Sequence, residues 1–145
     1  MRADGVFRAQ PMETMLITSP PPGTLPRAVL VIGLSDPATL DGERLRQATR
    51  LAMREAIRHG ARTMAFAPSV LDAGHTDNAA LDMPAVMLDG MLSALRAELA
   101  LVAAGLAPAS TLQHCTFDVG AARVASAAQA FVAAFAELSH AGLGT

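Results

Sequence analysis

The sequence predicts an α/β fold, a three-layer sandwich in which three main helices cover a mixed, mostly parallel sheet of about four strands. A short apolar run at 28–34 is followed by an amphipathic stretch over 41–59 and a second apolar run at 62–68. This order of strand, helix and parallel strand is a βαβ unit, which is typical of α/β sheets. The chain of 145 residues is 52% apolar, so we expect a single domain over 1–145, with a folded core at 12–140 and a loose segment at 1–11.

Two further strands complete the predicted sheet. Residues 12–18 form the first strand, which we expect to pair antiparallel with 28–34. Between them, the proline-rich segment 19–26 can be neither helix nor inner strand. It reads as a connecting loop; the alternative, a ligand for a partner protein, is the less common use of such segments. The fourth strand, 112–117, runs parallel to the second and third through right-handed crossovers.

The first helix has a clear start and end. Asp41 is a capping residue and Gly60 is a stop signal. One apolar stripe faces the core. Its members are Leu45, Ala48, Ala52 and Ala56, widened by Thr49, Met53 and Ile57.

The second helix begins either at a cap formed by Asp77 or Asn78, or with Pro84 in its first turn, and it ends at Gly105. Met83, Met87 and Met91 have helical spacing, which indicates core packing rather than a binding groove. With Leu95, Leu99 and Val102 they make up its apolar face.

Asp118 is expected to cap the third helix. A seam at spacings of four and three follows it, which predicts a packed face. The seam consists of Val124, Ala128, Phe131, Phe135 and Leu138. We expect the first two helices on one face of the sheet and the third on the other.

Composition excludes several classes of protein. No apolar run approaches the ~20 residues of a membrane span, and no apolar segment of a secretory signal follows the N-terminus. A single cysteine, Cys115, fits a reducing compartment, so we expect a cytoplasmic protein. A net charge of −2 and the lack of Trp and Tyr argue against membrane and nucleic-acid partners.

The apolar segments resemble a known family. Residues 13–18 are similar to its ETLLLP strand, 25–34 to LPAKRVLLVGLG, and 36–56 to the helix that follows. Residues 60–68 resemble the GxxSIAFP strand of macro domains, and 116–118 their last strand. The chain thus resembles, over about 5–138, the N-terminal, macro-domain-like and non-catalytic domain of the cytosolic leucine aminopeptidases. Nothing resembles their NTDAEGR catalytic segment, and the family's first strands have no counterpart before residue 12.

The resemblance implies one candidate ligand loop. In macro domains the loop after the IAFP strand is glycine-rich and binds a diphosphate through backbone N–H groups. The matching positions here are Ser69, Asp72, Gly74 and His75. Gly74 is kept, but the paired glycines are lost, and Asp72 places a negative charge where phosphate would lie. An ordinary surface turn is the simpler reading.

Catalytic and metal sites are not expected. His75, Asp72 and Asp77 form too thin a cluster for zinc, which takes three or four fixed ligands. Cys115 and His114 are neighbours on a strand, so their side chains point to opposite faces and form no catalytic pair; Cys115 reads as a small buried residue. We predict no catalytic residue, no metal ligand and no cofactor.

Four arginines recur every four residues on the first helix, and they could form a ridge for an acidic or phosphate-bearing partner. They are Arg46, Arg50, Arg54 and Arg58. Like charges at this spacing slightly destabilise a helix, which favours a partner, whereas Glu43 and Glu55 nearby favour an ordinary solvated face.

The sequence therefore predicts a non-enzymatic assembly or interaction module. Strands that are apolar on both faces need cover on both, and three helices leave surface open, so we expect a homo-oligomer, most simply a dimer. The alternative is a macro-type domain that binds a nucleotide or an ADP-ribose-like molecule through 69–78. A third possibility is a subunit that works with a separately encoded catalytic chain.

Overall fold

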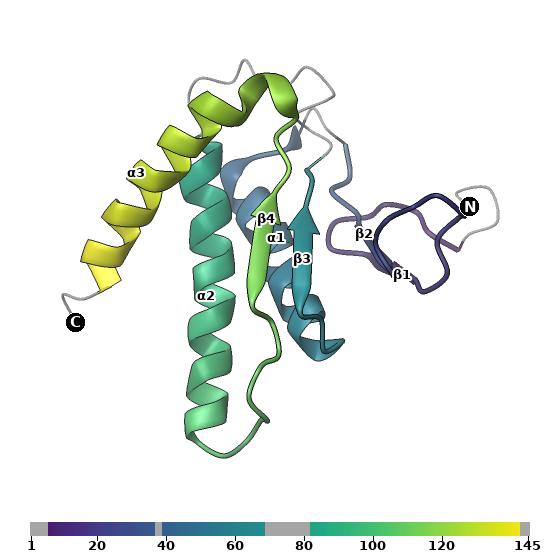
Figure 1. Ribbon diagram of the computed structural model, residues 1–145, viewed down its shortest axis with the longest axis horizontal. Helices are drawn as coiled ribbons and strands as arrows, with labels where there is room; N and C mark the ends of the chain where they lie inside the picture. The colour runs from purple at the N-terminus through teal and green to yellow at the C-terminus, as the bar shows by residue number, and fades with distance from the viewer. Residues whose placement is uncertain (1–5, 37–38, 69–81, 143–145) are drawn as a thin grey trace. The chain divides into compact units, whose positions relative to one another are not determined.

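The protein contains three α-helices and four short strands in two two-stranded sheets (Figure 1). The structure, a computed structural model, describes residues 6–36, 39–68 and 82–142. The chain divides into two compact units, Met1–Leu40 and Asp41–Thr145. The α/β class expected from the sequence is confirmed.

The first unit is a β-hairpin. Strand β1 (Thr14–Ile17) pairs antiparallel with β2 (Val29–Ile32), and Thr14 lies opposite Ile32. The antiparallel pairing predicted for the first two strands is confirmed. The proline-rich segment 19–26 connects the two strands and contains no helix or strand, as its fixed φ angles and missing N–H groups require.

The segment before β1 folds back along the hairpin. The Ser35 N–H donates to the Ala9 carbonyl at 2.9 Å, and the Glu13 carboxylate accepts from the N–H groups of Arg8 and Gln10. A Cβ atom at Gly33 would lie 2.7 Å from the carbonyl carbon of Ala9. The close approach of the two backbones therefore requires glycine at this position.

The second unit begins with helix α1 (Gly42–Arg58). The Asp41 carboxylate accepts from the Arg44 N–H at 2.8 Å, which confirms the predicted cap. At the other end Gly60 has φ +65°, and the N–H groups of Gly60 and Ala61 donate to the carbonyls of Ile57 and Ala56. This pair of bonds is the Schellman motif, so the predicted stop at Gly60 is also confirmed.

Helix α2 (Met83–Ala103) starts with Pro84 in its first turn, the second of the two starts considered. The capping residue is Asp82, whose carboxylate accepts from the Ala85 N–H at 3.1 Å. Asp77 and Asn78 lie outside the described residues. Gly105, with φ +70°, ends the helix in a second Schellman motif.

Two parallel strands form the sheet of this unit. Strands β3 (Thr63–Phe66) and β4 (His114–Phe117) pair with Thr63 opposite His114, as the crossover through α2 predicts. The chain then enters a 3₁₀ turn, η4 (Ala121–Arg123), and helix α3 (Val124–Gly142).

The expected start of the third helix at Asp118 is wrong. The Asp118 carboxylate accepts from the Gly120 N–H at 3.0 Å, which is a local Asx turn. The 3₁₀ turn separates Asp118 from α3, whose first residue is Val124.

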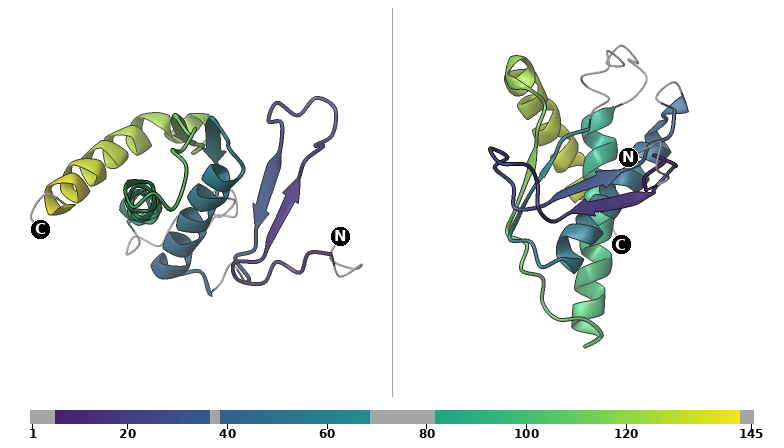
Figure 2. Two further views of the ribbon diagram at one scale, coloured as in Figure 1. Left: turned by 90° about the horizontal axis from the view of Figure 1, so that it is seen from below. Right: turned by 90° about the vertical axis from the view of Figure 1, so that its right-hand side faces the viewer.

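Side chains from one face of β3–β4 and from the helices make the core. Met53, Met91 and Ala94 are buried against Met64 and Phe66 of β3 and Phe117 of β4. The Phe117 ring packs edge-on against Phe66 and stacks on Phe131 of α3, with ring centroids 4.4 Å apart. All three helices therefore pack on the same side of β3–β4, with α2 between α1 and α3 (Figure 2).

The expected third layer is absent from the described part of this unit. The opposite face of β3–β4 carries Thr63, Ala65, His114 and Thr116, and all four are exposed. These side chains are small or polar, so this face tolerates water and needs no helix over it. The expectation that the third helix covers this face is wrong, because β3 is apolar on one side only.

Of the single sheet of about four strands expected from the sequence, the described residues show one two-stranded sheet in each unit. The first unit holds β1–β2 and the second holds β3–β4. Each strand is four residues long.

Candidate functional site

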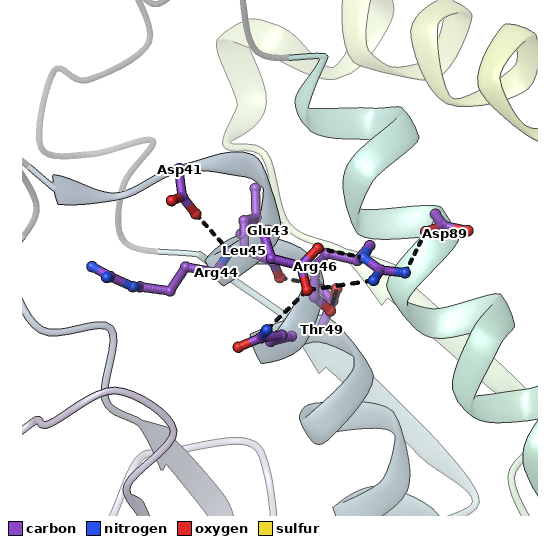
Figure 3. A network of polar contacts seen from close by, with 8 residues as sticks. Asp41, Glu43, Arg44, Leu45, Arg46, Thr49 and Asp89 are labelled. Atoms are coloured by element: carbon purple, nitrogen blue, oxygen red, sulfur yellow. Dashed lines mark hydrogen bonds and ion pairs between the residues drawn. The ribbon is translucent and has the colours of Figure 1, made fainter.

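The arginines of α1 do not form one cationic surface, because two of them have acidic partners. Arg46 contacts Glu43 through Nε at 3.0 Å and reaches across to Asp89 of α2 at 3.1 Å (Figure 3). Arg58 contacts Glu55 at 2.6 Å. Arg50 and Arg54 are exposed. The ridge is thus divided into two ion-paired ends and a short exposed centre.

These ion pairs shift the titration of the groups involved. Hydrogen bonds from Arg46 and then Gln47 hold the pKa of the Glu43 carboxyl below its usual value. The partners Glu43 and Asp89 raise the pKa of Arg46. The Arg46–Asp89 contact links α1 to α2, so it fixes helix packing rather than offering a charge to a ligand.

The candidate ligand loop cannot be placed. Ser69, Asp72, Gly74 and His75 all lie outside the described residues. The same applies to Asp77, so the thin metal cluster considered from the sequence is not tested. Within the described ranges, no three His, Cys, Asp or Glu side chains come together in a group that could hold a metal ion.

Cys115 faces the helices from β4. Its thiol donates to the Met91 sulfur at 3.4 Å, and burial raises the pKa of the thiol. The residue is exposed, so the expectation of a buried cysteine is wrong, although the thiol itself packs against Met91. A raised pKa leaves little thiolate at neutral pH, which is the wrong state for a nucleophile.

A shallow apolar groove of about 400 Å³ runs beside Cys115, between the second half of α2 and the segment that leads into β4. Its walls include Leu95, Leu99, Val102 and Leu112, with Glu98 at its side. Methionines 87 and 91 lie in the core instead, since both are buried, as their spacing predicts. Ser110, Gln113 and His114 also line the groove beside Cys115.

The largest departure from the expected site is on α3. The seam that the sequence predicts to pack is covered only in part. Phe131 and Leu138 are half-buried, and Ala134 beside them is buried. Val124 is 57% exposed, Phe135 is 52% exposed, and their neighbour Val132 is 70% exposed.

We call the exposed part of this helix the α3 stripe. It contains the three large apolar residues Val124, Val132 and Phe135 together with the alanines between and beside them, Ala125, Ala128 and Ala136. No charged residue occurs between Arg123 and Glu137. The sequence carried a signal for this stripe, because residues 124, 128, 132 and 135 also repeat at spacings of four and three.

Helix α3 also meets the length and composition of a membrane span. The segment Ala121–His140 has a mean hydropathy of 1.2, and 6% of it is buried. The expectation that no run approaches the length of a membrane span is therefore wrong for this helix, in which Ser126 and Gln129 interrupt the apolar residues. One segment of this kind is weak evidence for a span.

Comparison with known proteins adds no assignment to these surfaces: no family model, no curated protein and no solved structure matches the chain.

Proposed function

We propose that this protein is a non-enzymatic assembly module that associates with a second copy of itself. The observation that carries this proposal is the α3 stripe, on which Val124, Val132 and Phe135 are each more than half exposed. Clustered apolar side chains on a surface are characteristic of protein interfaces, whereas isolated ones are ordinary. Three large residues on one helix face make a cluster.

We also propose that the chain is related to the N-terminal, macro-domain-like domain of leucine aminopeptidases, and that its strands belong to a single mixed sheet as in that fold. The support is the order of elements: an antiparallel hairpin, then helix, strand, helix, strand and helix. The parallel β3–β4 pair joined through α2 is consistent with it. That domain is non-catalytic in the family, and a cytoplasmic location would follow from the relation.

One experiment separates the assembly module from its competitors. The purified chain is examined by light scattering at protein concentrations from about 1 to about 200 μM. This range brackets dimers whose dissociation constants are on the order of micromolar. We expect the mass to rise from the chain mass of 15.0 kDa toward twice that value. The melting temperature should rise with protein concentration, because association stabilises the folded state by mass action.

Two further measurements test the competing functions on the same sample. A thermal-shift panel of ADP-ribose and nucleotides should leave the melting temperature unchanged. Leucyl p-nitroanilide with added manganese or zinc should release no leucine, since hydrolysis of that kind needs a bound ion and an activated water. A constant 15.0 kDa mass, a shift with ADP-ribose or peptidase activity would each contradict the proposal.

A further inference from the structure

From the pattern of the α3 stripe we infer that the self-association surface is α3 itself, packed antiparallel against α3 of a second copy about a two-fold axis at residue 130. The inference rests on the proposed function, which it makes specific by naming the surface and the partner. The stripe is the part of α3 that α2 and β4 leave uncovered.

The first argument is the complementarity of the stripe with its own antiparallel copy. With a two-fold axis at residue 130, two residues of the facing helices lie at the same level when their residue numbers add up to 260. Val132 then faces Ala128, Val124 faces Ala136, and Phe135 faces Ala125 of the partner helix. Each large side chain meets an alanine, and this alternation of large and small residues lets two helices interlock closely.

A parallel pair in the same register lacks this property. It places Val132 against Val132 and Phe135 against Phe135, which forces the two helices apart at those levels. The antiparallel pair also sets the helix dipoles in opposite directions.

The second argument concerns the other environment in which the α3 stripe could be buried, a lipid bilayer. A lone helix in lipid is apolar all round, but α3 has a polar face with Ser126, Gln129 and Glu137. A second face is already in use, since Phe131 stacks on Phe117 and Ala134 is buried. The chain has no Trp or Tyr to anchor it at a membrane interface.

The third argument is the size of the contact. Helix α3 has 19 residues, which corresponds to about 28 Å at 1.5 Å per residue. A contact along one helix is smaller than the ~800 Å² per partner of a standard interface. The dimer should therefore exchange with monomer in the micromolar range rather than be permanent.

The test introduces the same charge on and beside the stripe. Val132→Glu places a carboxylate in the contact, and Ala133→Glu places it one position away, on an exposed site off the stripe. Because Val132 is 70% exposed, both variants should fold, which circular dichroism checks. We expect Val132→Glu to raise the dimer dissociation constant by about tenfold or more, since an unpaired carboxylate is costly in an apolar contact, while Ala133→Glu leaves it near the wild-type value.

The outcomes separate this inference from the proposed function. A wild-type dimer that survives Val132→Glu would overturn the assignment of α3 and leave the assembly module intact, as would an equal loss in both variants. A wild-type chain that is still monomeric at about 200 μM, the highest concentration tested, would overturn both the assignment of α3 and the proposed function. Co-flotation of the wild-type chain with phosphatidylcholine vesicles, reduced by Val132→Glu, would show that the stripe meets lipid instead. If Val132→Glu does not fold, Val132→Gln replaces it and the same comparison decides.

Discussion

Gly90 of α2 lies directly against Thr49 of α1, so close that a side chain at Gly90 has no room. A Cβ atom there would overlap the Thr49 hydroxyl and the Arg46 carbonyl oxygen, and it would lie 3.2 Å from the Arg46 carbonyl carbon. Thr49 is fully buried, and its hydroxyl donates to the carbonyls of Leu45 and Arg46 within its own helix. The two helices thus touch backbone to backbone at this point.

Gly90→Ala should destabilise the second unit although alanine is the better helix former. The gain in helix propensity is about 1 kcal/mol, but the overlap involves the backbone of α1, which cannot turn away. Overpacking of this kind costs about 1–3 kcal/mol, and because backbone is involved we expect a net loss of about 2 kcal/mol. Urea unfolding followed by circular dichroism measures it.

A double-mutant cycle with Thr49→Ala shows whether the contact is the cause. Removing the Thr49 hydroxyl relieves one of the overlaps and leaves the Arg46 carbonyl. The loss in the double variant should therefore be smaller than the sum of the two single losses by about 0.5 kcal/mol or more. Strict additivity, or a Gly90→Ala chain as stable as the wild type, would rule out the close approach.

The end of α1 gives a second prediction about glycine, here caused by the backbone angle. Gly60 has φ +65°, and the nearest atom to an added Cβ is 4.0 Å away, so space is not the problem. Gly60→Ala should cost about 1 kcal/mol, whereas Gly60→Asn should cost less, because asparagine tolerates this region. Equal stability of all three chains would contradict the Schellman end of the helix.

The pKa of Glu43 should follow its partner Arg46. Its folded-state pKa is lowered, so the pairing stabilises the fold at pH values above the unfolded pKa and is lost as the pH falls through the folded one. NMR titration of the Glu43 carboxyl should show the pKa return toward its ordinary value in Arg46→Gln. The matched control Arg50→Gln should leave it lowered; a shift in both variants would argue for a general charge effect.

The thiol of Cys115 should react slowly. Burial raises its pKa, and the thiolate is the reactive form. At pH 8 we expect modification by a disulfide reagent to be slower than that of free cysteine by about tenfold, and to reach the free rate once urea unfolds the chain. A folded-state rate equal to that of free cysteine would show that the sulfur is not covered by Met91.

The helices were the most predictable part of the fold. Capping at Asp41 and the stops at Gly60 and Gly105 are local chemistry, because one side chain or one backbone angle decides each. The prediction of the core-facing side of α1 was also correct, since Leu45, Ala48 and Ala52 are buried. These features need no knowledge of the rest of the chain.

The sheet and the outer surfaces were harder, because they depend on which faces meet. β3 is apolar on the side of Met64 and Phe66 but carries Thr63 and Ala65 on the other, and the short apolar run hid this alternation. On α3 the apolar residues occupy more than half of the circumference, so periodicity alone could not tell which part packs inside. The candidate loop at 69–78 was predictable only by resemblance, and it lies outside the described residues.

The most direct test of the central claim is disulfide cross-linking in the register of the proposed dimer. Two chains are made in a Cys115→Ala background, one with Ala128→Cys and one with Val132→Cys, and they are mixed under mild oxidation. The two-fold axis at residue 130 brings these positions face to face, within the short Cβ separation that a disulfide needs. We predict that the mixture cross-links faster than either chain alone and faster than a mixture in which Ala133→Cys replaces Val132→Cys. Cross-linking that is absent, or equal in all of these samples, would contradict association through α3.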